Sequence, residues 1–113
     1  MPRNAANLDL TFQALADPTR RAMVERLSRG HASVSELARP YEMSLPAIVQ
    51  HLAMLEKSGL VRSEKVGRVR TFSMVPAALS LAEKWLNQRR AQWEQRLDRL
   101  GEHLKQFPDG EPE

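Results

Sequence analysis

The C-terminal third of the chain constrains its fold more than any other stretch. Pro76 suits the first turn of a helix, where its missing N–H would have no partner anyway, and no further proline occurs before Phe107. Apolar residues then recur at spacings of three and four, the period of one helix face. This stripe consists of Leu79, Ala82, Leu86, Trp93, Leu97, Leu100, Leu104 and Phe107, with Arg89 in the one polar position and Trp85 beside it. We therefore predict a long helix with a heptad-like stripe over about 76–106.

Such a stripe needs something to cover it. The rest of the chain is about 75 residues long and must already bury its own short helices and hairpin. A second copy of the chain is the simplest cover, because apolar patches of this size are rare on monomers. The alternative is a helix that bends back on its own domain at Gly101. The dimer interface predicted on this helix comprises Leu79, Ala82, Trp85, Leu86, Trp93, Leu97 and Leu100.

Composition limits the class of protein. A chain of 113 residues that is 42% hydrophobic suits one domain with a small core, and three Phe, two Trp and one Tyr make that core mainly aliphatic. The absence of cysteine excludes disulfides, thiolate metal sites and cysteine catalysis. No run of residues reaches the length of a membrane span, and the N-terminus lacks a signal-peptide pattern. We therefore expect a cytoplasmic protein with no membrane contact.

The charge is distributed unevenly along the chain. The net charge is +3, but the last seven residues hold Asp109, Glu111 and Glu113, so residues 1–106 carry +6. A basic folded part suits a polyanionic partner such as nucleic acid, and it is also compatible with solubility alone. Residues 1–106 are expected to form one domain, and residues 107–113 have the composition of a disordered acidic tail.

The N-terminal region predicts one short helix. Residues 1–7 have no apolar period and are expected to form a loose arm. Leu8, Phe12 and Leu15 follow at spacings of four and three. This spacing favours a first helix at about 8–16.

Two further helices are marked by capping residues. Asp17-Pro18, an N-cap followed by proline, favours a second helix over about 18–29. Ser33 and Glu36 form a capping box that opens a short third helix, which Pro40 ends. Four arginines on the second helix are expected to form a solvated face: Arg20, Arg21, Arg26 and Arg29.

A helix over about 44–58 has the clearest boundaries in the chain. Ser44 is a good N-cap, Pro46 lies in the first turn, and Gly59 is placed to end the helix in a left-handed conformation. The predicted inner face is Leu45, Ile48, Leu52 and Leu55, and the predicted outer face is Pro46, Ala47, Gln50, Ala53, Met54 and Lys57. Because the outer face is flat at its N-terminal end, it can enter a DNA major groove and present Gln50 to base edges. An ordinary surface helix is the alternative.

A basic hairpin is predicted directly after this helix. Leu60–Val66 and Val69–Val75 are rich in Val, Phe and Thr, and Gly67-Arg68 between them suits a two-residue primed turn. A hairpin in this position, after a helix-turn-helix, is called a wing, and its arginines can reach the DNA backbone or the minor groove. The alternative is an edge hairpin protected from aggregation by charge. Its bases are Arg62, Lys65, Arg68 and Arg70, against one acid, Glu64.

The order of these elements resembles the ArsR-type winged-helix transcriptional regulators of bacteria. The matching stretches are ALADPTRRAMVERL (14–27), SVSELA (33–38), SLPAIVQHLAMLEKSGLV (44–61) and GRVRTF (67–72). The resemblance implies a mainly α fold with a small β-hairpin (α+β), namely a winged helix-turn-helix with a long C-terminal dimerisation helix. It also implies a homodimer that binds double-stranded operator DNA and usually represses, with the first helix, including Leu8 and Phe12, in the dimer interface.

By the same resemblance, the N-terminal half of the helix at 44–58 enters the major groove. The positions that match are Ser44, Leu45, Pro46, Ala47, Gln50 and His51. Leu45 and Val49 stand where many relatives have a polar residue, so base readout here rests on Gln50 and on apolar contact with thymine methyl groups. The phosphate contacts are expected from Arg62, Lys65, Arg68 and Arg70.

The metal sites known in this family do not fit the sequence. One site uses cysteines at positions that match Ser33 and Ser35, and the chain has none. Another uses His, Asp and Glu across the paired last helices, where His103 is the one histidine. We therefore predict no metal and no cofactor, and the sequence indicates no inducer.

Two other functions compete with DNA binding. A winged helix can dock a protein instead, and an apolar patch at Leu45, Val49 and Met54 would suit that role. An enzyme is disfavoured, since no nucleophile–base pair or glycine-rich phosphate loop occurs at a recognisable spacing. Ser44 and His51 are separated by about 10 Å of helix rise, which is too far for a catalytic dyad.

Overall fold

The structure is a computed structural model that describes residues 2–106 and the side chains of residues 7–106. The acidic tail predicted for residues 107–113 lies outside the described residues. The chain divides into two compact units, Met1–Ala82 and Glu83–Glu113, which are described separately.

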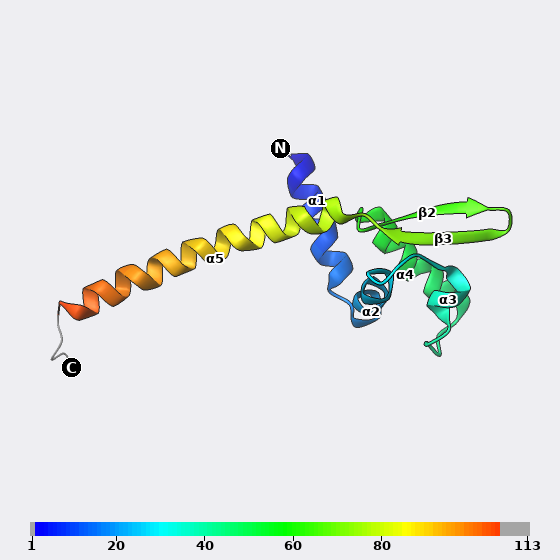
Figure 1. The fold of residues 1–113 in the computed structure, drawn as a ribbon, viewed down its shortest axis with the longest axis horizontal. Coiled ribbons are helices and arrows are strands. Elements are labelled where there is room, and N and C mark those ends of the chain that lie inside the picture. Colours follow the sequence, from blue (N-terminus) through cyan, green and yellow to red (C-terminus); the bar gives the residue numbers. More distant parts are fainter. Residues whose placement is uncertain (1, 107–113) are drawn as a thin grey trace. The chain divides into compact units, whose positions relative to one another are not determined.

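Four helices belong to the first unit: α1 (Pro2–Leu15), α2 (Pro18–Leu27), α3 (Val34–Ala38) and α4 (Leu45–Lys57) (Figure 1). The loose arm predicted for residues 1–7 is wrong for residues 2–7, which form the first half of α1. The apolar period marks the buried part of a helix, whereas Ala5 and Ala6 support a helix through their high intrinsic propensity. α2 ends two residues earlier than predicted, at a C-cap formed by Ser28.

The predicted helix caps are confirmed. Asp17 Oδ2 accepts the Arg20 backbone N–H at 3.0 Å at the start of α2. Ser33 and Glu36 form the full capping box of α3, since each side chain accepts the other residue's backbone N–H. Ser44 Oγ accepts from the Ala47 backbone N–H at 3.3 Å at the start of α4. These caps satisfy N–H groups that a helix leaves unpaired in its first turn.

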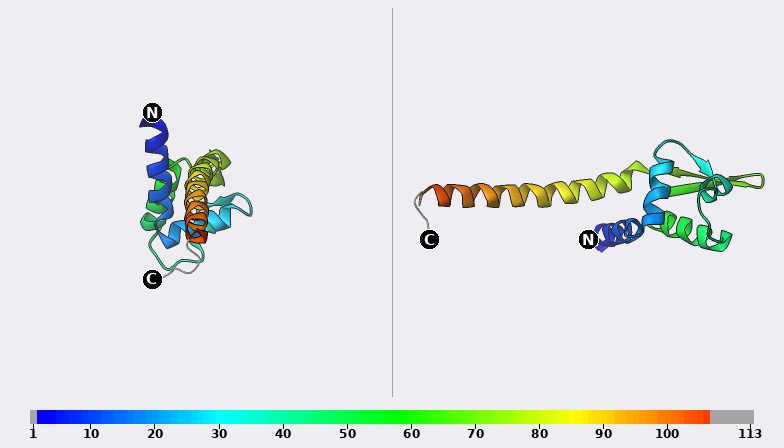
Figure 2. Two further views of the ribbon diagram at one scale, coloured as in Figure 1. Left: turned by 90° about the vertical axis from the view of Figure 1, so that its left-hand side faces the viewer. Right: turned by 90° about the horizontal axis from the view of Figure 1, so that it is seen from below.

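A three-stranded antiparallel sheet packs with these helices. β2 (Val61–Val66) and β3 (Val69–Met74) form the predicted hairpin, and Gly67 has φ +64° as the primed turn requires. We call this hairpin, residues 61–74, the wing. Its turn projects beyond the helices of this unit (Figure 2). β1 (Ala32–Ser33) pairs with β3 on the other side, which the sequence did not predict because two residues carry no period.

The core is aliphatic, as the composition predicted, with Phe72 as its aromatic member. Leu45 was predicted to face inward but is 58% exposed, because it lies in the first turn of α4, beyond the end of the core. Met54 was predicted on the outer face, yet it packs against the core from the side of the helix. The buried residues that form this core cluster are Ala14, Met23, Val24, Leu27, Ala32, Leu37, Ile48, Leu52, Leu55, Leu60, Val61 and Phe72.

The long helix α5 (Pro76–Lys105) begins in the first unit and makes up most of the second. It runs through Gly101 without a break, so the alternative of a bend at that glycine is wrong. Large apolar side chains along it are exposed in the single chain, among them Trp93 at 61% and Leu97 at 59%. None of the helices in residues 2–106 is long and apolar enough to cross a membrane.

Candidate nucleic-acid interface

The outward face of α4 is small and mostly apolar near its N-terminus. At 100° per residue, Pro46, Gln50 and Ala53 lie opposite the buried Ile48 and Leu52. All three are exposed, so the Gln50 amide is accessible to a ligand. The Ser44 cap holds the backbone of the first turn in place, which leaves a rigid helix end facing solvent.

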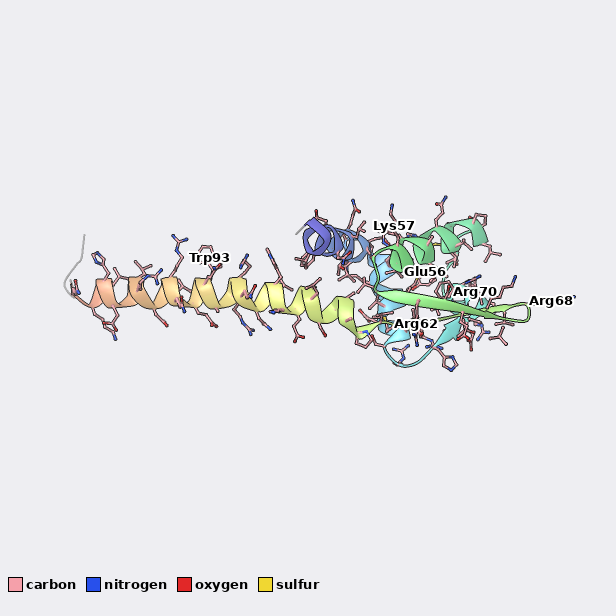
Figure 3. All side chains as sticks on the ribbon, turned by 90° about the horizontal axis from the view of Figure 1, so that it is seen from above. Glu56, Lys57, Arg62, Arg68, Arg70 and Trp93 are labelled. Atoms are coloured by element: carbon pink, nitrogen blue, oxygen red, sulfur yellow. The ribbon has the colours of Figure 1, made fainter. Side chains whose placement is uncertain are left out.

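The register of the wing separates its bases onto two faces. Ser63 pairs with the buried Phe72, and Lys65 pairs with Arg70, so these residues share the face that is turned toward α4. Arg62 pairs with Ser73 on the opposite face, where it lines a separate hollow with His31 and Glu64. Arg68 lies in the turn at the tip of the wing (Figure 3). The four basic residues predicted as one set are therefore not on one face of the wing, since Arg62 is turned away from α4.

A groove of about 390 Å³ lies between α4 and the wing. Val49, Ala53 and Glu56 contribute from α4, and Lys65, Arg68 and Arg70 contribute from the wing. The groove is thus basic on its wing side, and its helix side is apolar apart from Glu56. Figure 3 shows Glu56 and Arg70 on the two elements that form it.

Three side chains form a hydrogen-bonded chain across this groove. Arg70 Nη1 donates to Ser63 Oγ at 2.8 Å, and Ser63 Oγ donates to Glu56 Oε2 at 2.9 Å. The sequence reasoning missed Glu56 and Ser63 because they are seven residues apart and belong to different elements. The signal available in the sequence was the diagonal placement of Ser63 and Arg70 on one face of the hairpin.

Arg20 joins three helices behind this surface. Its Nε donates to the Ala14 carbonyl at 2.7 Å and its Nη2 donates to the Gln13 carbonyl at 3.1 Å, which caps the C-terminus of α1. Arg21 similarly donates to the Leu15 carbonyl at 2.6 Å. The solvated face predicted for these arginines is therefore wrong at Arg20, which is partly buried, whereas Arg21 is exposed as predicted. Both side chains donate to carbonyls that the end of α1 leaves unpaired.

His51 faces this junction. Its Nδ1 lies 3.3 Å from Arg20 Nη1 and 3.8 Å from Asp17 Oδ2. The backbone N–H of Arg20 lowers the pKa of the Asp17 carboxyl, with smaller contributions from the charges of His51 and Arg20. The ring is therefore turned toward α2, on the side of α4 away from the wing, and this geometry does not favour the base contact expected of His51.

The residues expected in the dimer interface differ in exposure. Leu8 is partly buried, and Phe12 and Leu79 are each 37% exposed. Ala82 is 4% exposed in the single chain, which leaves its methyl group little surface for a partner. The second unit carries Trp85, which is also 37% exposed, and the more exposed candidates Leu86, Trp93, Leu97 and Leu100.

Two arginines of α5 stack on its tryptophans. Arg89 lies over the Trp85 ring at 4.9 Å from the ring centroid, and Arg96 lies over the Trp93 ring at 5.4 Å. Arg89 fills the polar position of the stripe, and its aliphatic stem continues the apolar surface. The polar position therefore does not interrupt the stripe.

No group of three or more His, Asp or Glu residues that could hold a metal occurs within residues 2–106. Ser33 and Ser35, at the positions where the family's cysteine site would lie, have hydroxyl oxygens 3.3 Å apart. Ser33 is already used as the N-cap of α3. The pair serves the start of that helix.

Comparison with known proteins identifies the family of the chain. Residues 17–63 match the family model described as bacterial regulatory protein, arsR family. The HTH-type transcriptional regulator Rv2034 of Mycobacterium tuberculosis is 46% identical over 72 residues, which cover 64% of this chain and 67% of that protein. The transcriptional repressor SdpR of Bacillus subtilis is 27% identical over 75 residues, covering 66% and 83%.

A solved structure extends the similarity to most of the chain. The ArsR family transcriptional regulator RHA00566 is 47% identical, has a TM-score of 0.74, and is matched over 83% of this chain and 94% of that chain. A TM-score of this size means that the two chains share one fold over the matched length. Sequence, motifs and fold agree: this chain belongs to the ArsR family of bacterial winged-helix transcriptional regulators.

Proposed function

We propose that this protein is a homodimeric, sequence-specific binder of double-stranded operator DNA that represses transcription. The observation that carries the proposal is the groove between α4 and the wing. One side of it is an exposed helix end with small side chains, and the other side carries three basic side chains of the wing. α4 would lie in the major groove, where Gln50 reads a base edge and Leu45 and Val49 contact thymine methyl groups. Ser44 and the backbone N–H groups beside it would meet a phosphate.

The wing would supply the backbone contacts. Lys65, Arg68 and Arg70 lie on the face toward α4 or at the tip, and we assign the phosphate contacts to them. Arg62, on the opposite face, would contribute least. The three basic side chains of each of two protomers would neutralise about six phosphates, which predicts a slope near −5 when the logarithm of affinity is plotted against the logarithm of salt concentration.

The dimer would be formed by α1 and α5. The exposed apolar residues of α5 support this assignment, since a partner helix would remove them from water. A two-fold axis would also present two copies of α4 to successive turns of the major groove. Repression then follows from occupancy of the operator, and SdpR, a relative that is named as a repressor, supports this direction of regulation.

The experiment is selection of duplexes from a randomised pool, followed by titration of the selected DNA at two salt concentrations and measurement of mass in solution. A saturable dimer–DNA complex with the steep slope is expected. A promoter reporter that carries the selected site should lose expression when the protein is present. Increased reporter expression would contradict the repressor role, and a monomer that binds the site would contradict the dimer.

A protein-docking role is supported by one observation, the exposure of Leu45 at 58% and Val49 at 49% on α4. Apolar side chains on a rigid helix face suit a protein partner. The three bases on the neighbouring face of the wing oppose this role. Failure to select any duplex even at low salt would favour it over DNA binding.

A further inference from the structure

Glu56 is an acidic residue on the α4 side of the groove, whose wing side is basic. It lies on α4 two residues before the Ser58 C-cap, and it is exposed. If the groove receives DNA, a carboxylate there repels the phosphates, so its presence opposes binding unless it performs another task. Its contact with Ser63 indicates what that task is.

The direction of the hydrogen bonds in the chain is determined by its two ends. Arg70 can only donate and the Glu56 carboxylate can only accept, so the Ser63 hydroxyl must give its one proton to Glu56 and accept from Arg70. Both bonds involve a charged group, which makes them stronger than bonds between neutral groups. The bond to Ser63 uses one of the five N–H donors of Arg70 and thereby holds its side chain in one orientation.

The same hydrogen bonds join α4 to both strands of the wing. Glu56 belongs to α4, Ser63 to β2 and Arg70 to β3. A two-stranded hairpin is flexible on its own, so a link near the base of the wing limits the directions in which its arginines can point. Ordering these side chains before DNA arrives lowers the entropy cost of binding.

We propose that Glu56 is a positioning residue, which acts through Ser63 to hold Arg70 so that its remaining N–H groups meet DNA beside α4. The inference rests on the proposed DNA-binding function and deepens it. It assigns to an acidic side chain a favourable contribution to DNA affinity. Simple charge repulsion predicts the opposite sign, and the two accounts are therefore separable.

The test compares Glu56→Ala with Glu64→Ala, which removes an acid from the opposite face of the wing. Binding is titrated on the duplex selected by the wild-type protein. We expect Glu64→Ala to bind slightly tighter, because it only relieves repulsion, and Glu56→Ala to bind roughly three- to tenfold more weakly, the typical net value of one hydrogen bond. Ser63→Ala should show the same loss.

The Arg70→Ala background supplies the control for mechanism. If Glu56 acts through Arg70, then Glu56→Ala should cause no further loss in that background. Tighter binding by Glu56→Ala in the wild-type background, or an equal loss in both backgrounds, would overturn the proposal. Thermal unfolding of each variant identifies any loss that comes from a damaged fold.

A second readout needs no DNA. The Arg70 guanidinium should be ordered in NMR relaxation of the free wild-type protein and mobile in Glu56→Ala and Ser63→Ala. Equal mobility in all three proteins would overturn the positioning role. Failure of the wild-type protein to select any duplex would instead overturn the proposed function, and with it the role in DNA binding, while the relaxation result would still report whether the link exists.

Discussion

Arg20, on α2, links its own helix to two others. Its side chain donates to the carbonyls of Gln13 and Ala14 on α1 and lies against the His51 ring on α4. This junction supports the α4 helix from behind. The arginine does what a glycine cap does elsewhere, since it satisfies carbonyls that the end of a helix leaves unpaired. A residue that local reasoning assigns to the solvated surface therefore contributes to the stability of the domain.

Arg20→Ala should lower the free energy of unfolding by about 1–2 kcal/mol, because it removes a charge-assisted hydrogen bond at a partly buried site and a second one at an exposed site. Arg29→Ala is the matched control, since Arg29 is exposed on the same segment. Urea unfolding of both variants measures the difference. Equal stability of the two variants would mean that the junction contributes nothing.

Gln50 and Arg68 are expected to differ in the kind of contact they make with DNA. Gln50→Ala should weaken binding by roughly 1–3 kcal/mol to the selected site and relax the preference at one base pair, because an amide reads a base edge. Arg68→Ala should weaken binding to all duplexes and reduce the salt slope by about 1. Titration of selected and random duplexes measures both, and Arg62→Ala, on the opposite face of the wing, controls for the loss of a charge.

At the scale of the element, the helix caps link the stability of the domain to pH. Backbone N–H groups lower the pKa of Asp17 and of Glu36, since each carboxylate accepts a hydrogen bond at the start of a helix. Because the folded pKa is lower than the unfolded one, these groups stabilise the fold fully above the unfolded values, near pH 4. That stabilisation is lost as the pH falls through the lower, folded values.

Asp17→Asn should therefore flatten the fall in stability below about pH 4, because Asn keeps the cap but does not titrate. Stability is measured by urea unfolding at a series of pH values. Asp9→Asn removes one exposed carboxylate outside the caps and serves as the control. Parallel curves for the wild-type protein and Asp17→Asn would show that the cap carboxylate does not contribute to the acid response.

At the scale of the whole molecule, the stripe on α5 follows a seven-residue repeat. Leu79, Leu86, Trp93 and Leu100 are each seven apart, and so are Leu97 and Leu104. A seven-residue repeat corresponds to 3.5 residues per turn, slightly below the 3.6 of a straight helix, so two such stripes stay in contact when their helices form a left-handed supercoil. This period suits a coiled-coil contact with a partner helix.

Leu97→Glu should convert the proposed dimer to a monomer at micromolar concentration, because it places a charge in the centre of the apolar stripe. Gln95→Glu, which introduces the same charge on the opposite side of α5, should leave the dimer intact. Sedimentation equilibrium distinguishes the two outcomes. A monomeric Gln95→Glu variant, or a dimeric Leu97→Glu variant, would contradict the assignment of the interface.

The sequence by itself determined the features that depend on neighbours within four residues. Ser44, Pro46 and Gly59 predicted the bounds of α4, and Gly67 predicted the turn of the wing, because caps and turns are local hydrogen-bond and dihedral requirements. The period of three and four likewise predicted α5 as a single long helix.

Only the tertiary structure decided the features that join distant residues. The Arg20–His51 contact spans 31 positions, and β1 exists because Ala32 meets Phe72 in the sheet. Neither leaves a local signal, since two strand residues have no period and an arginine side chain reaches several carbonyls equally well. The link from Glu56 to Arg70 arose in the same way, when packing brought the end of α4 against one face of the wing.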